Sequence, residues 1–125
     1  MSSKERDYLL FLEDIMEAIV KIEDYTENMD QDAFSRSSLI QDAVIRNFEV
    51  IGEAVKNVPK RVRQKYTQVE WSEAAGFRNV LIHNYFGIDV ESIWDTICNN
   101  IPLFKEHMID VLRLEKKKQT LEKNV

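Results

Sequence analysis

The feature that most constrains this chain is a three-and-four spacing of apolar side chains that recurs along most of its length. Such spacing places the apolar groups on one face of an α-helix. The first stripe consists of Tyr8, Leu12, Ile15, Ile19, Ile22 and Met29. Only three Gly and two Pro occur in 125 residues, 44% of which are hydrophobic, so long helices meet few breakers. The sequence therefore predicts an all-α fold, with residues 1–125 forming a single domain.

The stripes and the capping residues predict a compact bundle of four to five helices. The expected helices cover about residues 4–29, 37–57, 59–66, 71–86 and 89–115, with a turn at residues 30–32. The possible caps are Ser37 or Ser38 for the second helix, Ser72 for the fourth and Asp89 for the last. Pro102 lies within the last apolar stripe without shifting its phase, which predicts one helix kinked near Pro102. Residues 116–125 form a polar tail that we expect to fray.

Composition also limits where such a chain can work. No apolar run reaches the length of a membrane-spanning helix, and residues 1–7 contain no signal-peptide hydrophobic region. The single Cys98 cannot form an internal disulfide, which fits a reducing compartment. We therefore expect a cytoplasmic protein without membrane contact. Cys98 falls on an apolar stripe, which predicts a buried thiol rather than a nucleophile.

Charge is distributed unevenly along the chain. The net charge is −5, which argues against a protein that coats nucleic acid nonspecifically. Ten acidic and three basic residues precede Ala33, whereas the run from Lys56 to Lys65 holds five basic residues and no acid. A solvated surface is the usual meaning of such a run, and a rim that attracts phosphate is the alternative.

The densest group of chemically able side chains lies between Arg78 and Tyr85. Asn79 and His83 are one helical turn apart, and Arg78 is within reach of His83 along the same helix. RNA carries its own nucleophile, the 2′-hydroxyl, so a protein that cleaves it must move protons and stabilise a phosphorane. His can act as acid or base, and Arg grips phosphate. Asn79 could orient His83 or hydrogen-bond the substrate, and Tyr85 could stack on a base or donate to a phosphate oxygen.

The sequence offers fewer suitable residues for a metal site or for a thiol nucleophile. A metal site needs several ligands at workable spacing, but the only histidines are His83 and His107, far apart in sequence. Cys98 is the only thiol that a histidine base could activate. A purely structural role also stays open, with Arg78 paired to an acid such as Asp89 or Glu91. Residue types alone favour that structural role.

The pattern Arg, four residues, His, one residue, Tyr resembles the HEPN superfamily, and in particular the HepT-like toxins of HepT/MntA toxin–antitoxin pairs. The segments on either side carry the resemblance further. Residues 46–54, Arg-Asn-Phe-Glu-Val-Ile-Gly-Glu-Ala, resemble the family's second-helix signature. Residues 84–89 and the Ile93-Trp94-Asp95 segment resemble the stretch that follows its active-site motif.

This resemblance implies a HEPN-type bundle and an RNA-cleaving toxin that uses no cofactor or metal. Arg78 and His83 match the residues that carry cleavage, and Asn79 matches the polar residue beside the Arg. It further implies a homodimer whose two motifs share a cleft. The implied antitoxin is a separate MntA-like nucleotidyltransferase that attaches AMP to Tyr85. The alternative from another class is a non-catalytic subunit that binds a nucleotide or organises its nucleotidyltransferase partner.

Overall fold

The computed structural model describes residues 3–77 and 89–123, and all regular structure in this part of the chain is helical. The all-α prediction is therefore confirmed. The described helices are α1 (Ser3–Thr26), α2 (Gln31–Ser35), α3 (Ser38–Asn57), α4 (Lys60–Lys65), α5 (Trp71–Ala75), α7 (Val90–Asn99) and α8 (Ile101–Lys123). None of these helices combines the length and the apolar character needed to cross a bilayer.

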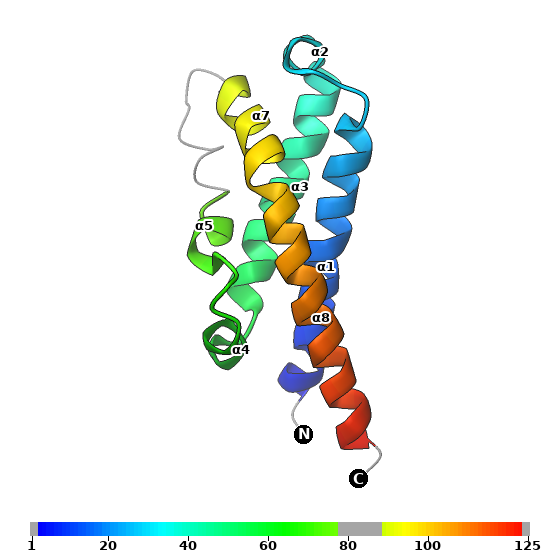
Figure 1. Cartoon of the computed structure of the whole chain (residues 1–125), viewed down its shortest axis with the longest axis vertical. Helices are drawn as coiled ribbons and strands as arrows, with labels where there is room; N and C mark the ends of the chain where they lie inside the picture. The colour runs from blue at the N-terminus through cyan, green and yellow to red at the C-terminus, as the bar shows by residue number, and fades with distance from the viewer. Residues whose placement is uncertain (1–2, 78–88, 124–125) are drawn as a thin grey trace.

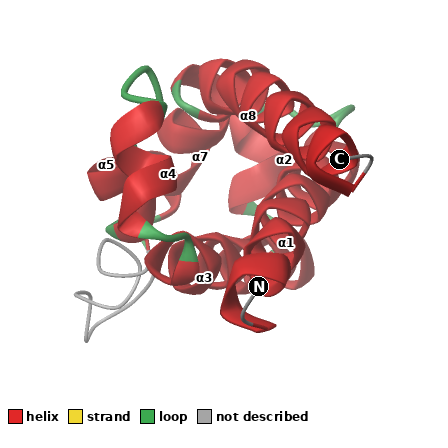
Figure 2. Cartoon of the chain, turned by 90° about the horizontal axis from the view of Figure 1, so that it is seen from below, coloured by secondary structure: helices red, strands yellow, loops and turns green. Residues whose placement is uncertain are grey.

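The long helices run lengthwise and enclose the core (Figure 1). Helix α1 contacts both α3 and α8, while α5 packs on α3, and α2 contacts α3 and α7. Seen along the long axis, the helices surround a common centre (Figure 2). The side chains that fill this centre are fully buried and include Leu12, Ile19, Phe48, Ile51 and Met108.

Side-chain caps explain where several helices begin. Of the two possible caps of α3, Ser37 accepts a hydrogen bond from the Ile40 amide at 3.3 Å, whereas Ser38 is the first residue of the helix. Asp30 accepts one from the Ala33 amide at 2.8 Å and starts α2. The sequence indicated only a turn there, because a five-residue helix is too short to show a period. Helix α1 accordingly ends at Thr26, before the expected Met29.

The last helix is interrupted near Pro102, where a kink was expected. Helix α7 ends at Asn99 and α8 begins at Ile101, while the Asn100 amide still bonds to the Thr96 carbonyl at 3.0 Å. Pro102 falls in the first turn of α8, where its missing N–H leaves fewer carbonyls unpaired than it would in mid-helix.

Two expectations for this region differ from the structure. The prediction of a buried Cys98 was wrong, because its thiol is exposed. Cys98 follows the buried Ile97 directly, and one residue turns the helix by about 100°, away from the core. The polar segment from residue 116, which we expected to fray, continues α8 as helix to Lys123. Lys116 pairs there with Glu13 of α1 at 3.2 Å.

Candidate functional site

The four site residues predicted from the sequence, Arg78, Asn79, His83 and Tyr85, lie outside the described residues. The structure does describe both flanks of the motif, which are Phe77 before it and Asp89 after it. The geometry of these flanks defines the surroundings of the motif.

The leading flank is fixed by aromatic side chains in the core. Helix α5 begins at Trp71, whose indole N–H donates to the Tyr66 carbonyl at 2.9 Å. Phe77 is buried and meets Phe48 of α3 edge-on at 5.2 Å and Phe104 of α8 at 6.2 Å between ring centroids. The residue that precedes Arg78 is thus held between α3 and α8.

The expected continuous helix from Trp71 into the motif is not what the described residues show. Helix α5 ends at Ala75, and the Gly76 amide donates to the Ser72 and Glu73 carbonyls at 3.0 and 3.1 Å. Ser72 was a possible cap for this helix, but the helix begins one residue earlier, and Glu70 at its cap position makes no side-chain bond.

The trailing flank is a capped helix start. Asp89 accepts hydrogen bonds from the Ser92 amide at 3.0 Å and from the Ser92 hydroxyl at 2.7 Å, so it caps α7 as predicted. These two bonds hold the pKa of the Asp89 carboxyl below its usual range. Both carboxylate oxygens therefore accept a hydrogen bond from Ser92. Further along α7, Trp94 meets Phe34 of α2 edge-on at 5.3 Å.

A cavity of about 190 Å³ lies beside the leading flank, between α5 and the start of α8. We call it the Phe77 cavity. Its walls include Glu73, Phe77, Asn100, Leu103, Phe104 and His107. The sequence analysis did not assign this site, because its two sides come from segments about thirty residues apart. From the sequence, His107 was considered only as a second histidine, far from His83 along the chain.

Metal ligands do not gather in the described part of the chain. No three His, Cys, Asp or Glu side chains among residues 8–77 and 89–122 lie close enough together to hold an ion. Asn47, in the segment that resembles the family's second helix, is buried and donates to the Ala43 carbonyl of its own helix at 2.8 Å. The buried Asn47 side-chain amide therefore has a hydrogen-bond partner within its own helix.

A second polar cluster, centred on Glu115, was missed by the sequence analysis. Glu115 is fully buried and accepts hydrogen bonds from the Tyr8 hydroxyl at 2.7 Å, the Tyr66 hydroxyl at 2.6 Å and the Lys65 ammonium at 3.1 Å. The phase of the stripe could have revealed it, because Glu115 continues the spacing of Met108 and Val111. From the sequence, Glu115 received no role, because it is charged and adjoins the polar tail.

The pKa values of the cluster follow from its burial. Burial and the hydrogen bond to Glu115 raise the pKa of Tyr8 to about 12, and the same causes raise the pKa of Tyr66. Burial also raises the pKa of Glu115, but the bonds from Tyr66, Tyr8 and Lys65 outweigh it and leave this pKa below its usual range. Glu115 is thus an ionised carboxylate that joins α1, α4 and α8.

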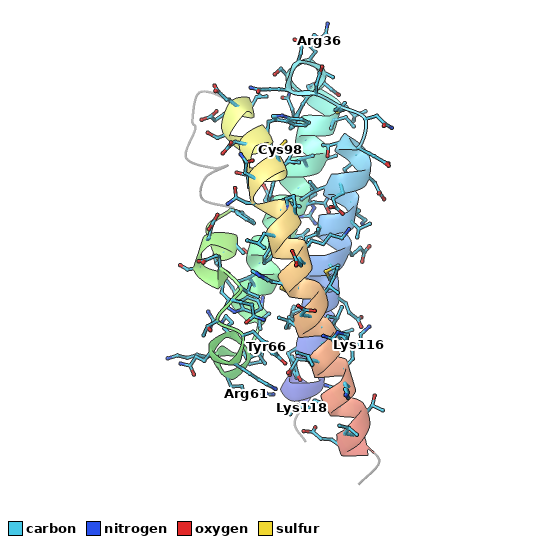
Figure 3. All side chains as sticks on the ribbon, viewed as in Figure 1. Arg36, Arg61, Tyr66, Cys98, Lys116 and Lys118 are labelled. Atoms are coloured by element: carbon cyan, nitrogen blue, oxygen red, sulfur yellow. The ribbon has the colours of Figure 1, made fainter. Side chains whose placement is uncertain are left out.

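Part of the basic run lies beside this cluster, at the end of the bundle where Figure 3 labels Arg61 and Tyr66. Lys65 pairs with Glu115, and the Arg61 guanidinium lies 5.1 Å from the centroid of the Tyr8 ring. Both side chains come from α4, so part of the run's charge is used to attach α4 to the bundle.

Comparison with known proteins supplies the family. The family described as ribonuclease HepT-like matches residues 15–111, which include both flanks and the whole motif.

The chain belongs to the HepT-like family.

Curated relatives agree with this assignment. A "Putative RNase" of Methanocaldococcus jannaschii is 48% identical over 98 residues, which cover 78% of this chain and 81% of the relative. A "Probable ribonuclease HepT" of Thermococcus cleftensis is 42% identical over 105 residues, covering 84% and 93%.

A third relative is longer than this chain. The "Gamma-glutamylcyclotransferase and putative RNase" of Methanocaldococcus jannaschii is 41% identical over 114 residues, which cover 90% of this chain. The chain spans about half of that protein, 51% of its length. No solved structure matches this HepT-like chain.

Proposed function

We propose that this HepT-like protein is an endoribonuclease toxin that cleaves RNA with Arg78 and His83 and needs no metal ion. The observation that carries the proposal is the family match over residues 15–111, because the matched range contains the Arg78…His83…Tyr85 pattern in full. The relatives named as ribonucleases support the same activity.

The chemistry assigns a role to each motif residue. The RNA 2′-hydroxyl attacks the adjacent phosphorus, and the 5′-oxygen leaves, so the first product is a 2′,3′-cyclic phosphate. His83 moves a proton in this step, and Arg78 stabilises the charge that develops on the phosphoryl oxygens. Asn79 positions His83 or the substrate. Because the nucleophile belongs to RNA, the reaction does not need a metal-bound hydroxide.

Two partners complete the proposal. A second copy of the chain brings its own motif to a shared cleft, which supplies the second acid or base that one His83 cannot provide. An MntA-like nucleotidyltransferase, acting as antitoxin in the cytoplasm, transfers AMP to Tyr85. The added phosphate is negatively charged and bulky, so beside Arg78 and His83 it would occupy the phosphate site and repel RNA.

A cleavage assay in EDTA tests the core of this proposal. Purified protein should cut single-stranded RNA with chelator present and leave 2′,3′-cyclic ends. Loss of a general acid or base costs on the order of 10²–10⁴-fold in rate, so His83→Ala should abolish detectable cleavage, as should Arg78→Ala.

The control is Arg113→Ala, which removes an exposed arginine of α8 and should still cleave. Circular dichroism should be unchanged in all three variants. Cleavage by His83→Ala at the wild-type rate would favour the non-catalytic subunit instead.

A further inference from the structure

The Phe77 cavity has the size and lining of a site for one ring system. Two buried phenylalanines, Phe77 and Phe104, and the small Ala74 contribute to its walls. Its volume of about 190 Å³ lies below the roughly 300–1,000 Å³ of pockets that hold a whole drug-sized ligand. A single ring system fits this size better than an entire nucleotide.

Polar groups with unused hydrogen-bonding capacity surround this apolar slot. Glu73 accepts one bond, from the Asn100 side-chain amide, through one of its two oxygens. The Asn100 side-chain oxygen also stays available. Gln68, Glu70 and His107 make no side-chain hydrogen bond within the described part of the chain, although all three line the cavity.

The charged side chains that line the cavity determine which hydrogen-bonding groups a bound ring must carry. Glu70 and Glu73 are the charged side chains of the cavity and both are carboxylates, which repel phosphate but accept hydrogen bonds from N–H groups. A neutral ring that carries amino or imino donors meets this requirement. Single-stranded RNA bases are read in this way, by stacking and by bonds to their Watson–Crick edges. Guanine offers two adjacent donors to one carboxylate, whereas uracil has no exocyclic amine.

Position links the cavity to the motif. Phe77 lines the cavity and immediately precedes Arg78 in the chain. A ring held there would leave its sugar and phosphate near the start of the motif.

We propose that the Phe77 cavity binds one amino-bearing nucleobase, with guanine as the best match, of the RNA strand being cleaved. The acceptor is Glu73, and Phe77 and Phe104 form the apolar walls. This inference rests on the proposed ribonuclease function and adds a base preference to it.

Cleavage-site sequencing on an RNA of random sequence tests the inference. Wild type should cut preferentially where guanine occupies one fixed position relative to the broken bond. Glu73→Gln removes the carboxylate but keeps its shape, and should reduce the preference for guanine over uracil by about tenfold, the usual effect of losing a bidentate base contact. Glu91→Gln, an exposed carboxylate on α7, is the matched control and should keep the wild-type preference.

A second pair of variants tests occupancy without altering charge. Leu103 and Leu121 are both exposed on α8, at 55% and 59%, but only Leu103 lines the cavity. Leu103→Trp should fill the mouth of the cavity and weaken the preference, while Leu121→Trp should not. An unaltered guanine preference in both Glu73→Gln and Leu103→Trp, or no preference in wild type, overturns the inference.

Nucleoside binding separates this inference from the nuclease proposal. Saturation-transfer NMR with guanosine and uridine on the His83→Ala protein should show guanosine contact that Leu103→Trp removes. Guanosine contact without RNA cleavage by wild type would overturn the nuclease and leave a base pocket. Guanosine contact together with a cleavage profile insensitive to Glu73→Gln would overturn the assignment of the base to RNA.

Discussion

Tyr85 is the single residue at which the toxin and antitoxin parts of the proposal can be told apart. If its hydroxyl accepts AMP, Tyr85→Phe should fold, remain toxic in cells and escape neutralisation by the partner nucleotidyltransferase. Intact-mass spectrometry after co-expression should find whole AMP additions on wild type and none on the variant. Tyr25→Phe alters an exposed tyrosine on α1 and should be modified and neutralised like wild type.

Two results would contradict this role for Tyr85. Equal AMP additions on wild type and on Tyr85→Phe would exclude it as the acceptor. Loss of toxicity in the absence of the partner would instead show that the hydroxyl takes part in cleavage or in binding RNA.

At the scale of helices, Glu115 joins three elements through one buried carboxylate. Glu115→Ala would leave the Tyr8 and Tyr66 hydroxyls buried without their acceptor and would open a cavity. Because a bond to a charged group contributes about 1.5–3 kcal/mol and an orphaned polar group costs about 1–3 kcal/mol, we expect a loss of about 2–4 kcal/mol in the free energy of unfolding. Urea denaturation measures this loss, and Glu122→Ala, exposed on the same helix, should change the free energy by less than about 0.5 kcal/mol.

The pH dependence of this effect has a defined sign. The folded-state pKa of Glu115 lies below its usual range, so its stabilisation is present above the unfolded pKa of about 4.3 and is lost as pH falls through the folded value. Wild type should therefore lose stability on acidification, and the difference from Glu115→Ala should shrink there. A difference of less than about 0.5 kcal/mol at pH 7 would show that the cluster does not stabilise the fold.

The sequence predicted the long helices because period and caps agreed in them. Ser37 and Asp89 were identified as caps from their positions alone, and both make the expected hydrogen bonds. Helices α2 and α5 have only five residues each and show no apolar period. The existence of α2 and the end of α5 at Ala75 could therefore not be predicted. The position of Glu115 in the apolar stripe of α8 indicated that it is buried. We gave this position less weight than the charge of the side chain.

At the scale of the whole molecule, the candidate site is only partly readable from sequence. The motif residues follow from a local pattern, and Arg78, Asn79, His83 and Tyr85 stay predictions because they lie outside the described residues. The Phe77 cavity depends on tertiary packing, since Glu73 and His107 meet only when α5 and α8 pack on the same core. No local pattern encodes that juxtaposition.

A homodimer is the last expectation, and it determines whether the proposed cleft can exist. One motif supplies a single histidine, whereas cleavage needs both a base for the 2′-hydroxyl and an acid for the leaving oxygen. Light scattering at micromolar concentration should give about twice the 14.7 kDa of one chain. The sharper measurement refolds wild type together with an equal amount of the inactive His83→Ala variant. If the cleft needs one histidine from each motif, every mixed dimer is inactive, so random pairing leaves about a quarter of the dimers active, whereas independent motifs would leave half of the sites active. A monomeric mass, or a mixture that keeps half of the wild-type activity, would contradict the shared cleft.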